Sequence, residues 1–242
     1  MSAVEEAFRA VGIVGGIEAL VGEGTTATLG TTVPGLTALA SWRALRALLP
    51  PLGFWPVLLG DADAVDRLRD YWEASAASEI EHAAGLKPKE WLEARSSSDP
   101  HYYERVHGAW PAQVTPQDFV IPTEILSGRP LAAVHLGAVP SPLSWEAPAY
   151  LAFGGWNECP LPREHVAMLR YWFEACGAEV VGISDDIVEC AVSRPPLTRE
   201  AALVLADEQF VYCADIVGQG AQTLEGLAAV LLGRRNWYFW WD

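Results

Sequence analysis

The chain has 242 residues, a formal net charge of −15 and a pI near 4.7. Its long-range field repels phosphate, so the composition argues against nonspecific binding to DNA, RNA or an anionic membrane. Half of the sequence (51 %) is hydrophobic, including 11 Trp, and such a chain buries a sizeable core. The acidic charge suits a cationic partner, and it equally suits a chain that only has to stay soluble.

The first half of the chain shows mainly helical patterns. Residues 5–20 predict a helix interrupted by glycines, and residues 25–34 predict a loop or an irregular strand. Residues 38–49 place Leu and Trp on one helical stripe, and Pro50 ends that helix. The other predicted elements of this half are a short apolar strand at residues 54–59, a helix at 61–85 and a helix that starts at 87–91.

From residue 132 onward, short apolar strands alternate with capped helices. Pro162 marks the first turn of one helix and Gly177 its end, and Thr198 and Thr223 are the expected N-caps of two more. The predicted strands lie at residues 132–139, 149–153, 179–183, 187–192 and 237–242. The last of these carries five aromatic rings, which a disordered tail would not keep in water, so we expect a packed strand with no tail after it.

These elements predict an α+β fold with a mixed β-sheet and helices on one face. The order of elements from residue 149 is close to a split β-α-β, ferredoxin-like pattern. No linker divides the chain, so we expect a single domain over residues 1–242. It would have a helical N-terminal portion over about residues 1–131 and an α+β core over about residues 132–242.

The expected location is the cytoplasm, without a membrane partner. Glu5 and Glu6 stand where a signal peptide needs basic residues. The least charged stretch, residues 24–42, carries Thr, Gly and Pro instead of the dense Leu, Ile and Val of a membrane helix. Without tight spacing or an export signal, the four cysteines are predicted to be free thiols: Cys159, Cys176, Cys190 and Cys213.

Three uncommon strings stand out in the second half: GGWNECP at residues 154–160, YCADIV at 212–217 and WYFWWD at 237–242. Together they resemble the DUF4253 family, a bacterial domain of unknown function. The resemblance covers roughly residues 136–242 and, more loosely, residues 54–59. The family name implies no mechanism, so the resemblance assigns no catalytic residue.

The loop over residues 154–165 offers the richest chemistry in the sequence. Two glycines let its backbone turn sharply, and it runs into a helix N-terminus whose free N–H groups favour an anion. Its side chains can stack, accept, donate or attack: Trp156, Asn157, Glu158, Cys159 and His165. A structural corner, in which Trp156 fills the core and Asn157 caps the turn, explains the same residues without any function and fits them better.

Catalysis in this loop requires more than these residues. A Cys159–His165 pair needs a third, orienting group, for which Asp215 or Asp207 are the candidates. A metal site from Cys159, His165, Cys213 and Asp215 lacks closely paired ligands, so we predict no metal and no cofactor. Asp185 and Asp186 would make a carboxylate pair, but an ordinary hairpin turn explains them better.

We therefore predict a binding or interaction module whose Trp-rich site lies between the GGWNECP loop and the terminal WYFWWD strand. Its ligand would be a small molecule or a segment of a protein partner. The expected binding residues are Trp156, Asn157, Glu158 and His165 at the rim of the main pocket, with Tyr212 or Asp215 opposite. The alternative is an enzyme, a hydrolase or group transferase, that uses Glu158, Cys159 or His165.

Overall fold

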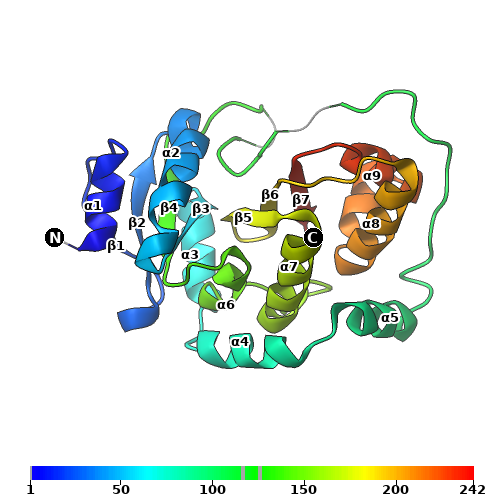
Figure 1. The fold of residues 1–242 in the computed structure, drawn as a ribbon, viewed down its shortest axis with the longest axis horizontal. Coiled ribbons are helices and arrows are strands. Elements are labelled where there is room, and N and C mark those ends of the chain that lie inside the picture. The colour runs from blue at the N-terminus through cyan, green and yellow to red at the C-terminus, as the bar shows by residue number, and fades with distance from the viewer. Residues whose placement is uncertain (1, 116–117, 125–126) are drawn as a thin grey trace.

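The residues that the computed structural model describes, 2–115, 118–124 and 127–242, contain one seven-stranded mixed β-sheet (Figure 1). Its strands are β1 (Glu18–Val21), β2 (Thr28–Val33), β3 (Trp55–Gly60), β4 (Val134–Val139), β5 (Ala178–Ile183), β6 (Ile187–Val192) and β7 (Asn236–Trp240). The order across the sheet is β1-β2-β4-β3-β5-β6-β7, and β3 and β5 are parallel while the other neighbours are antiparallel. The predicted α+β class with a mixed sheet is confirmed.

The helices follow the local signals of the sequence closely in the second half of the chain. They are α1 (Ala3–Ala10), α2 (Gly35–Leu48), α3 (Ala62–Tyr71), α4 (Ala76–Gly85), α5 (Pro88–Ser98), α6 (Ala147–Tyr150), α7 (Pro162–Cys176), α8 (Arg199–Tyr212) and α9 (Leu224–Leu231), with a π-helical turn η4 (Ile216–Ala221). Thr198 and Thr223 cap α8 and α9 through their side chains, and Gly177 ends α7 in the left-handed region. None of the helices in the described residues combines the length and the apolar character that a bilayer crossing requires.

The N-terminal portion contributes strands as well as helices. The interrupted helix predicted over residues 5–20 is wrong beyond Ala10, because the chain turns at Gly12, where φ is +82°, and residues 18–21 pair as β1. The irregular segment at residues 25–34 contains the regular strand β2. The long helix predicted for residues 61–85 is divided into α3 and α4.

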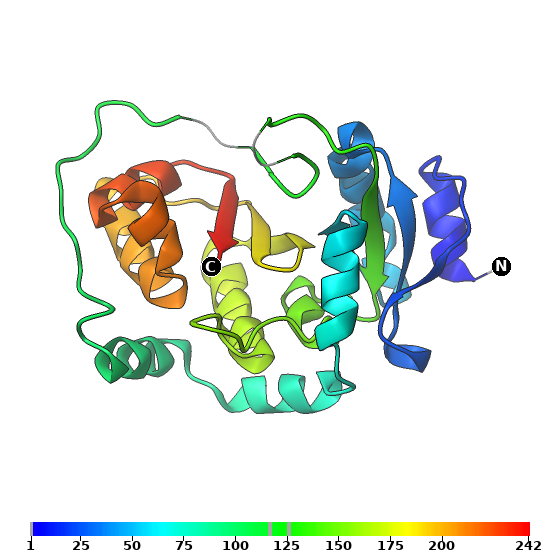
Figure 2. The ribbon, with the colours of Figure 1, turned by 180° about the vertical axis from the view of Figure 1, so that it is seen from behind.

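Helices cover both faces of the sheet at β3 and β4, which corrects the prediction that they cover one face. Figures 1 and 2 show α2 on one side of these strands and α3 on the other, and both helices contact β3. Every residue of β3 is buried, as expected of a strand enclosed on both sides. The Trp42 indole of α2 donates a hydrogen bond to the Pro56 carbonyl at 2.9 Å, which fixes the helix against the strand.

The strand predicted at residues 149–153 does not form, so the split β-α-β order is wrong. Pro148 lies in the first turn of α6, where its missing N–H does no harm, and the chain then turns. Strands β5, β6 and β7 are consecutive antiparallel neighbours. The C-terminal part of the sheet is therefore a β5–β6 hairpin extended by β7 after α8 and α9, and it joins the N-terminal part through the parallel β3–β5 contact.

The aromatic strand β7 is packed into the interior. Trp237, Phe239 and Trp241 are 0–2 % exposed and share one face, where the Phe239 ring stacks on Trp172 of α7 at 5.6 Å and meets Tyr212 of α8 edge-on at 4.9 Å. The opposite face of the neighbouring strand β6 is covered by an irregular segment instead of a helix. There the buried Glu189 carboxylate accepts the backbone N–H groups of residues 120 and 121 at 2.6 and 3.1 Å.

Candidate functional site

The GGWNECP loop is a sharp turn closed on itself by its own backbone. Gly154 and Gly155 have φ of +110° and +91°, which L side chains rarely adopt. A Cβ at Gly154 would lie 2.0 Å from the Pro160 carbonyl oxygen, and the Gly155 N–H donates to that oxygen at 3.0 Å. The two glycines are thus required by the tight approach of the two ends of the loop.

One side of this loop faces the interior and holds three of the predicted residues together. His165 is fully buried in α7, with Nε2 3.4 Å from the Cys159 Sγ and Nδ1 2.5 Å from the Tyr212 hydroxyl of α8. The His165 ring also lies edge-on to Trp241 at 5.3 Å. We call Cys159, His165 and Tyr212 the buried triad, which joins the loop to α7, α8 and β7.

The buried triad is electrically neutral. Burial raises the pKa of the Cys159 thiol and of the Tyr212 phenol, and it lowers the pKa of His165 to about 3, with the nearby Arg95 lowering it further. A catalytic cysteine needs the opposite shift, toward the thiolate. Cys159 and His165 are therefore as close as a nucleophile and its base, but both are in their neutral forms. None of the three side chains of the triad lines a cavity among those found in the described residues.

The orienting partner of His165 is Tyr212, and the two predicted carboxylates lie elsewhere. Asp207 forms an ion pair with Arg105 at 2.7 Å. Asp215 accepts the Asp242 N–H at 3.2 Å and the Gln219 amide at 3.1 Å, so it holds the end of β7 instead of an active-site base.

The other side of the loop faces outward. Asn157, with φ of +45°, donates its side-chain amide to the main-chain oxygen of Asp242 at 2.7 Å. The exposed Glu158 carboxylate lies 3.4 Å from the Arg95 guanidinium and 3.3 Å from the Tyr103 hydroxyl, and Arg95 also donates to the Glu158 carbonyl. Sequence reasoning missed Arg95 because it lies 63 residues from Glu158 in a helix with no motif.

Between the loop and the end of β7 lies a cavity of about 230 Å³, which we call the aromatic hollow. Its lining residues are Arg67, Tyr71, Trp156, Asp185, Asp186, Trp240, Trp241 and Asp242. Tyr71 is 69 % exposed, and its ring stacks on Trp156 with centroids 6.4 Å apart and planes 24° apart. Of the predicted binding residues, Trp156 alone lines this hollow, while Asn157 touches Asp242 at its border.

Carboxylates outnumber cations in the aromatic hollow. Arg67 pairs with Asp185 at 2.5 Å, whereas the carboxylate of Asp186 accepts the Trp240 indole N–H at 2.9 Å. Burial, and then the charge of Asp185, raises the pKa of Asp186. Together with the exposed Asp242, the lining carries three side-chain carboxylates and one guanidinium.

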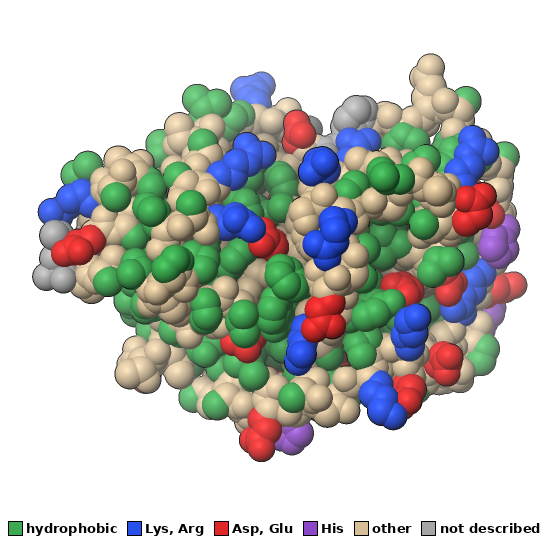
Figure 3. All heavy atoms as spheres, viewed as in Figure 1, with side chains coloured by type: hydrophobic (Ala, Val, Ile, Leu, Met, Phe, Trp, Pro, Cys, Tyr) green, Lys and Arg blue, Asp and Glu red, His purple; other side chains and the backbone are tan. Residues whose placement is uncertain are grey.

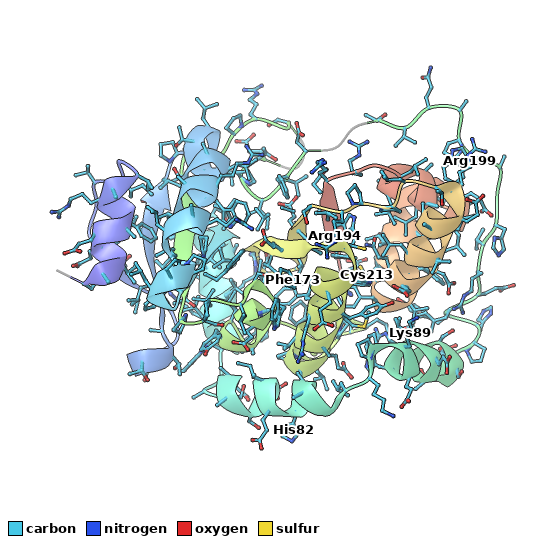
Figure 4. All side chains as sticks on the ribbon, in the orientation of Figure 1. His82, Lys89, Phe173, Arg194, Arg199 and Cys213 are labelled. Carbon is cyan, nitrogen blue, oxygen red and sulfur yellow. The ribbon has the colours of Figure 1, made fainter. Side chains whose placement is uncertain are left out.

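The proposed metal ligands are not arranged as a site. Cys213 is buried, lies in the interior next to the end of α8 (Figure 4), and donates its thiol to the Trp240 carbonyl at 3.0 Å. Within the described ranges, no group of three or more His, Cys, Asp or Glu side chains is placed to hold a metal ion. The four cysteines are free thiols, as the sequence predicts.

The comparison with family models identifies the C-terminal part of this molecule. Residues 135–242, which contain the loop, the buried triad and β7, match the model described as "Domain of unknown function (DUF4253)". The resemblance inferred from the three strings is thus confirmed for this part of the chain. The comparisons with curated proteins and with solved structures found no match to this chain.

Proposed function

We propose that this protein is a binding module that takes a cationic group, such as a lysine side chain of a partner, into the aromatic hollow. The observation that carries the proposal is the pairing of an exposed aromatic stack, Tyr71 on Trp156, with an excess of carboxylates. Aromatic rings attract cations through their electron-rich faces, by about 0.5–2 kcal/mol. A carboxylate beside the rings adds a charge-assisted hydrogen bond.

The size and the field of the protein support the same ligand. A hollow of about 230 Å³ is small for a whole ligand but suits the head group of one side chain. The net charge of −15 draws cations from a distance, and this attraction weakens as salt is added. On the face shown in Figure 3, acidic and basic side chains are interspersed. The excess of carboxylates in the hollow is local, and it is what would give a cation its place.

The free thiols support a reducing compartment, and we propose the cytoplasm as the place where this partner is met. Catalysis through Cys159 and His165 is not part of this proposal, because the burial of that pair keeps both groups neutral. Glu158 likewise does not line the hollow and is held by Arg95.

A titration with N-acetyl-lysine amide, followed by NMR at low salt, tests the proposal. We expect a dissociation constant on the order of 1 mM and no binding of N-acetyl-norleucine amide, which has the same carbon stem without the charge. Tyr71→Ala should weaken binding about three- to tenfold, whereas Tyr71→Phe, which keeps the ring, should preserve it.

Glu81→Gln is the control for net charge, because it removes an exposed carboxylate of α4 that does not line the hollow. It lowers the net negative charge by one unit without touching the rings, so the affinity for N-acetyl-lysine amide should stay nearly unchanged. Equal binding of the lysine and norleucine compounds, or an unchanged affinity in Tyr71→Ala, would refute the proposal.

A further inference from the structure

A second and larger cavity, of about 620 Å³, lies between η4, α9, β7 and residues 111–115. Its wall is largely apolar, with Ile216, Leu227 and Val230 facing the rings of Tyr238 and Trp240. This volume falls within the range of sites that bury a small molecule. Trp240 lines both this cavity and the aromatic hollow, so the two sites are neighbours.

Two hydrogen-bond donors in this wall lack partners. Gln209 and Trp237 are each 1 % exposed and line the cavity. The Nε2 of Gln209 and the Nε1 of Trp237 have no hydrogen-bond partner among the described residues. A buried donor without an acceptor costs free energy, typically about 1–3 kcal/mol. Both donor atoms are covered just behind the cavity wall, so an acceptor in the cavity pairs with them once these side chains turn toward it.

A cation lines the same cavity. Arg234 is half-buried, lines the cavity, and forms no ion pair within the described part of the chain. The carboxylate that lines the same cavity, Asp215, is occupied by the Gln219 amide and the Asp242 N–H. The unmatched polar groups of the wall are therefore donors and a positive charge, in a protein whose net charge is −15.

The backbone of the wall is unusual as well. Residues 216–221 form a π-helical turn, a rare conformation that is frequent at functional sites. The turn ends at Gln222, whose φ is +65°. This turn places Ile216, Gln219 and Gly220 along the cavity, where an ordinary α-helical continuation of the chain would present a different set of residues.

From these observations we propose that the cavity binds a small amphipathic anion, with a carboxylate that meets Arg234, Gln209 and Trp237 and an apolar body that lies among the side chains of η4 and α9. The carboxylate supplies acceptors for the orphan donors and a counter-charge for the guanidinium. The site is separate from the aromatic hollow, and its ligand has the opposite charge.

Three naphthalene compounds of one shape and different charge test this site on the full chain. The probes are 1-naphthylacetate, the neutral 1-naphthylacetamide and the cationic 1-naphthylmethylamine. We expect 1-naphthylacetate to bind most tightly and to shift the indole N–H signal of Trp237 in NMR spectra, a signal assigned by its absence in Trp237→Phe. Tightest binding by the amine, or a Trp237 signal that no probe moves, would overturn the proposal.

Two neighbouring arginines provide the matched variants. Arg234→Gln should weaken the binding of 1-naphthylacetate about tenfold, because it removes the counter-charge. Arg235→Gln changes the net charge equally at an exposed position outside the cavity and should leave the affinity unchanged. Equal effects of the two variants would show that the anion responds to net charge alone, and would refute the site.

Gln209→Leu separates binding from folding. It replaces an amide that has an unpaired donor by an apolar side chain of similar size, so the melting temperature should stay the same or rise while the affinity for 1-naphthylacetate falls. A fall in melting temperature with unchanged affinity would mean that Gln209 serves the fold only, and it would remove Gln209 from the site.

Discussion

The two sides of the GGWNECP loop have opposite environments. On the inner side, Cys159 and His165 are buried against Tyr212 and are neutral. On the outer side, Trp156 lies beside an exposed tyrosine and a group of carboxylates. The residue types that look most reactive in the sequence thus serve the interior, and the hollow on the outer side is lined mainly by rings and aspartates.

This difference shows that the reactivity of a side chain depends on its environment as well as on its residue type. A thiol 3.4 Å from an imidazole is a nucleophile with its base only if the environment favours the ion pair. Here burial favours the neutral forms of both groups. Truncation, acid, substitution and alkylation should therefore act differently on the inner and outer sides of the loop.

Removal of the inner packing should have the largest effect. Deletion of residues 237–242 takes away three fully buried rings, and the loss of each large buried side chain costs about 3–5 kcal/mol against a total stability of about 5–15 kcal/mol. We expect no cooperative thermal unfolding transition by circular dichroism. Deletion of Asp242 alone keeps the rings and should preserve the transition, so equal behaviour of the two truncations would contradict the assigned role of β7.

Acid should weaken the inner side through His165. In the unfolded chain this group takes up a proton near its ordinary pKa of 6.5, whereas burial lowers its pKa in the folded state to about 3. The unfolded state therefore binds more protons between pH 6.5 and 3, and stability falls as the pH falls through this window, by up to about 4–5 kcal/mol. Urea unfolding of the natural chain and of His165→Gln across this range measures the effect.

The difference between these two chains isolates the histidine. Glu189 acts in the opposite direction, because burial raises its pKa to about 7 and its carboxyl then favours the folded state as the pH falls from 7 to 4.5. Glu189 is present in both chains, so its contribution cancels. The stability advantage of the natural chain over His165→Gln should shrink toward acid pH, and a constant difference would show that His165 is not buried neutral.

Much of the C-terminal architecture could be predicted because its signals are local. Thr198, Thr223 and Gly177 act within one turn of their own helices, so a single sequence contains the information. The strand predicted at residues 149–153 is wrong because its local signal is ambiguous. A short apolar run fits a helical turn as well as a strand, and periodicity alone does not separate the two.

The candidate site was harder to predict, because it depends on contacts between distant segments. Trp156 was predicted at the rim of the main pocket. It lines the aromatic hollow, where its ring partner Tyr71 lies 85 positions earlier in a helix without a motif. His165 and Tyr212 were predicted on opposite sides of a pocket, whereas their side chains touch each other in the interior. Their burial follows from the packing of α7, α8 and β7, which no local pattern encodes.

Two substitutions on the outer side should have moderate and unequal effects. Asn157→Ala loses the hydrogen bond to the Asp242 main chain and places an alanine at φ of +45°, so we expect a loss of about 1–2 kcal/mol. Glu158→Ala removes an exposed ion pair with Arg95, which should cost less than about 1 kcal/mol. Chemical denaturation of both variants gives these values.

Asn157→Gly sharpens this pair, because glycine accepts the backbone conformation and loses only the hydrogen bond. Its stability should lie between that of the natural chain and that of Asn157→Ala. A larger loss for Glu158→Ala than for Asn157→Ala would mean that Glu158 and Arg95, and not the turn, hold the outer side of the loop.

The alkylation rates of the thiols test whether the inner side of the loop is buried and neutral, and this measurement needs no destabilising substitution. Reducing agent should leave the melting temperature unmoved, because the four cysteines are free. In iodoacetamide at pH 8, Cys176 should be alkylated first, since it is half-buried while Cys159 is 4 % exposed and its pKa is raised by burial. Peptide mass mapping over time measures the order. Faster alkylation of Cys159 than of Cys176 would show a thiolate at the inner side of the loop, and it would restore the pair of Cys159 and His165 as a catalytic candidate.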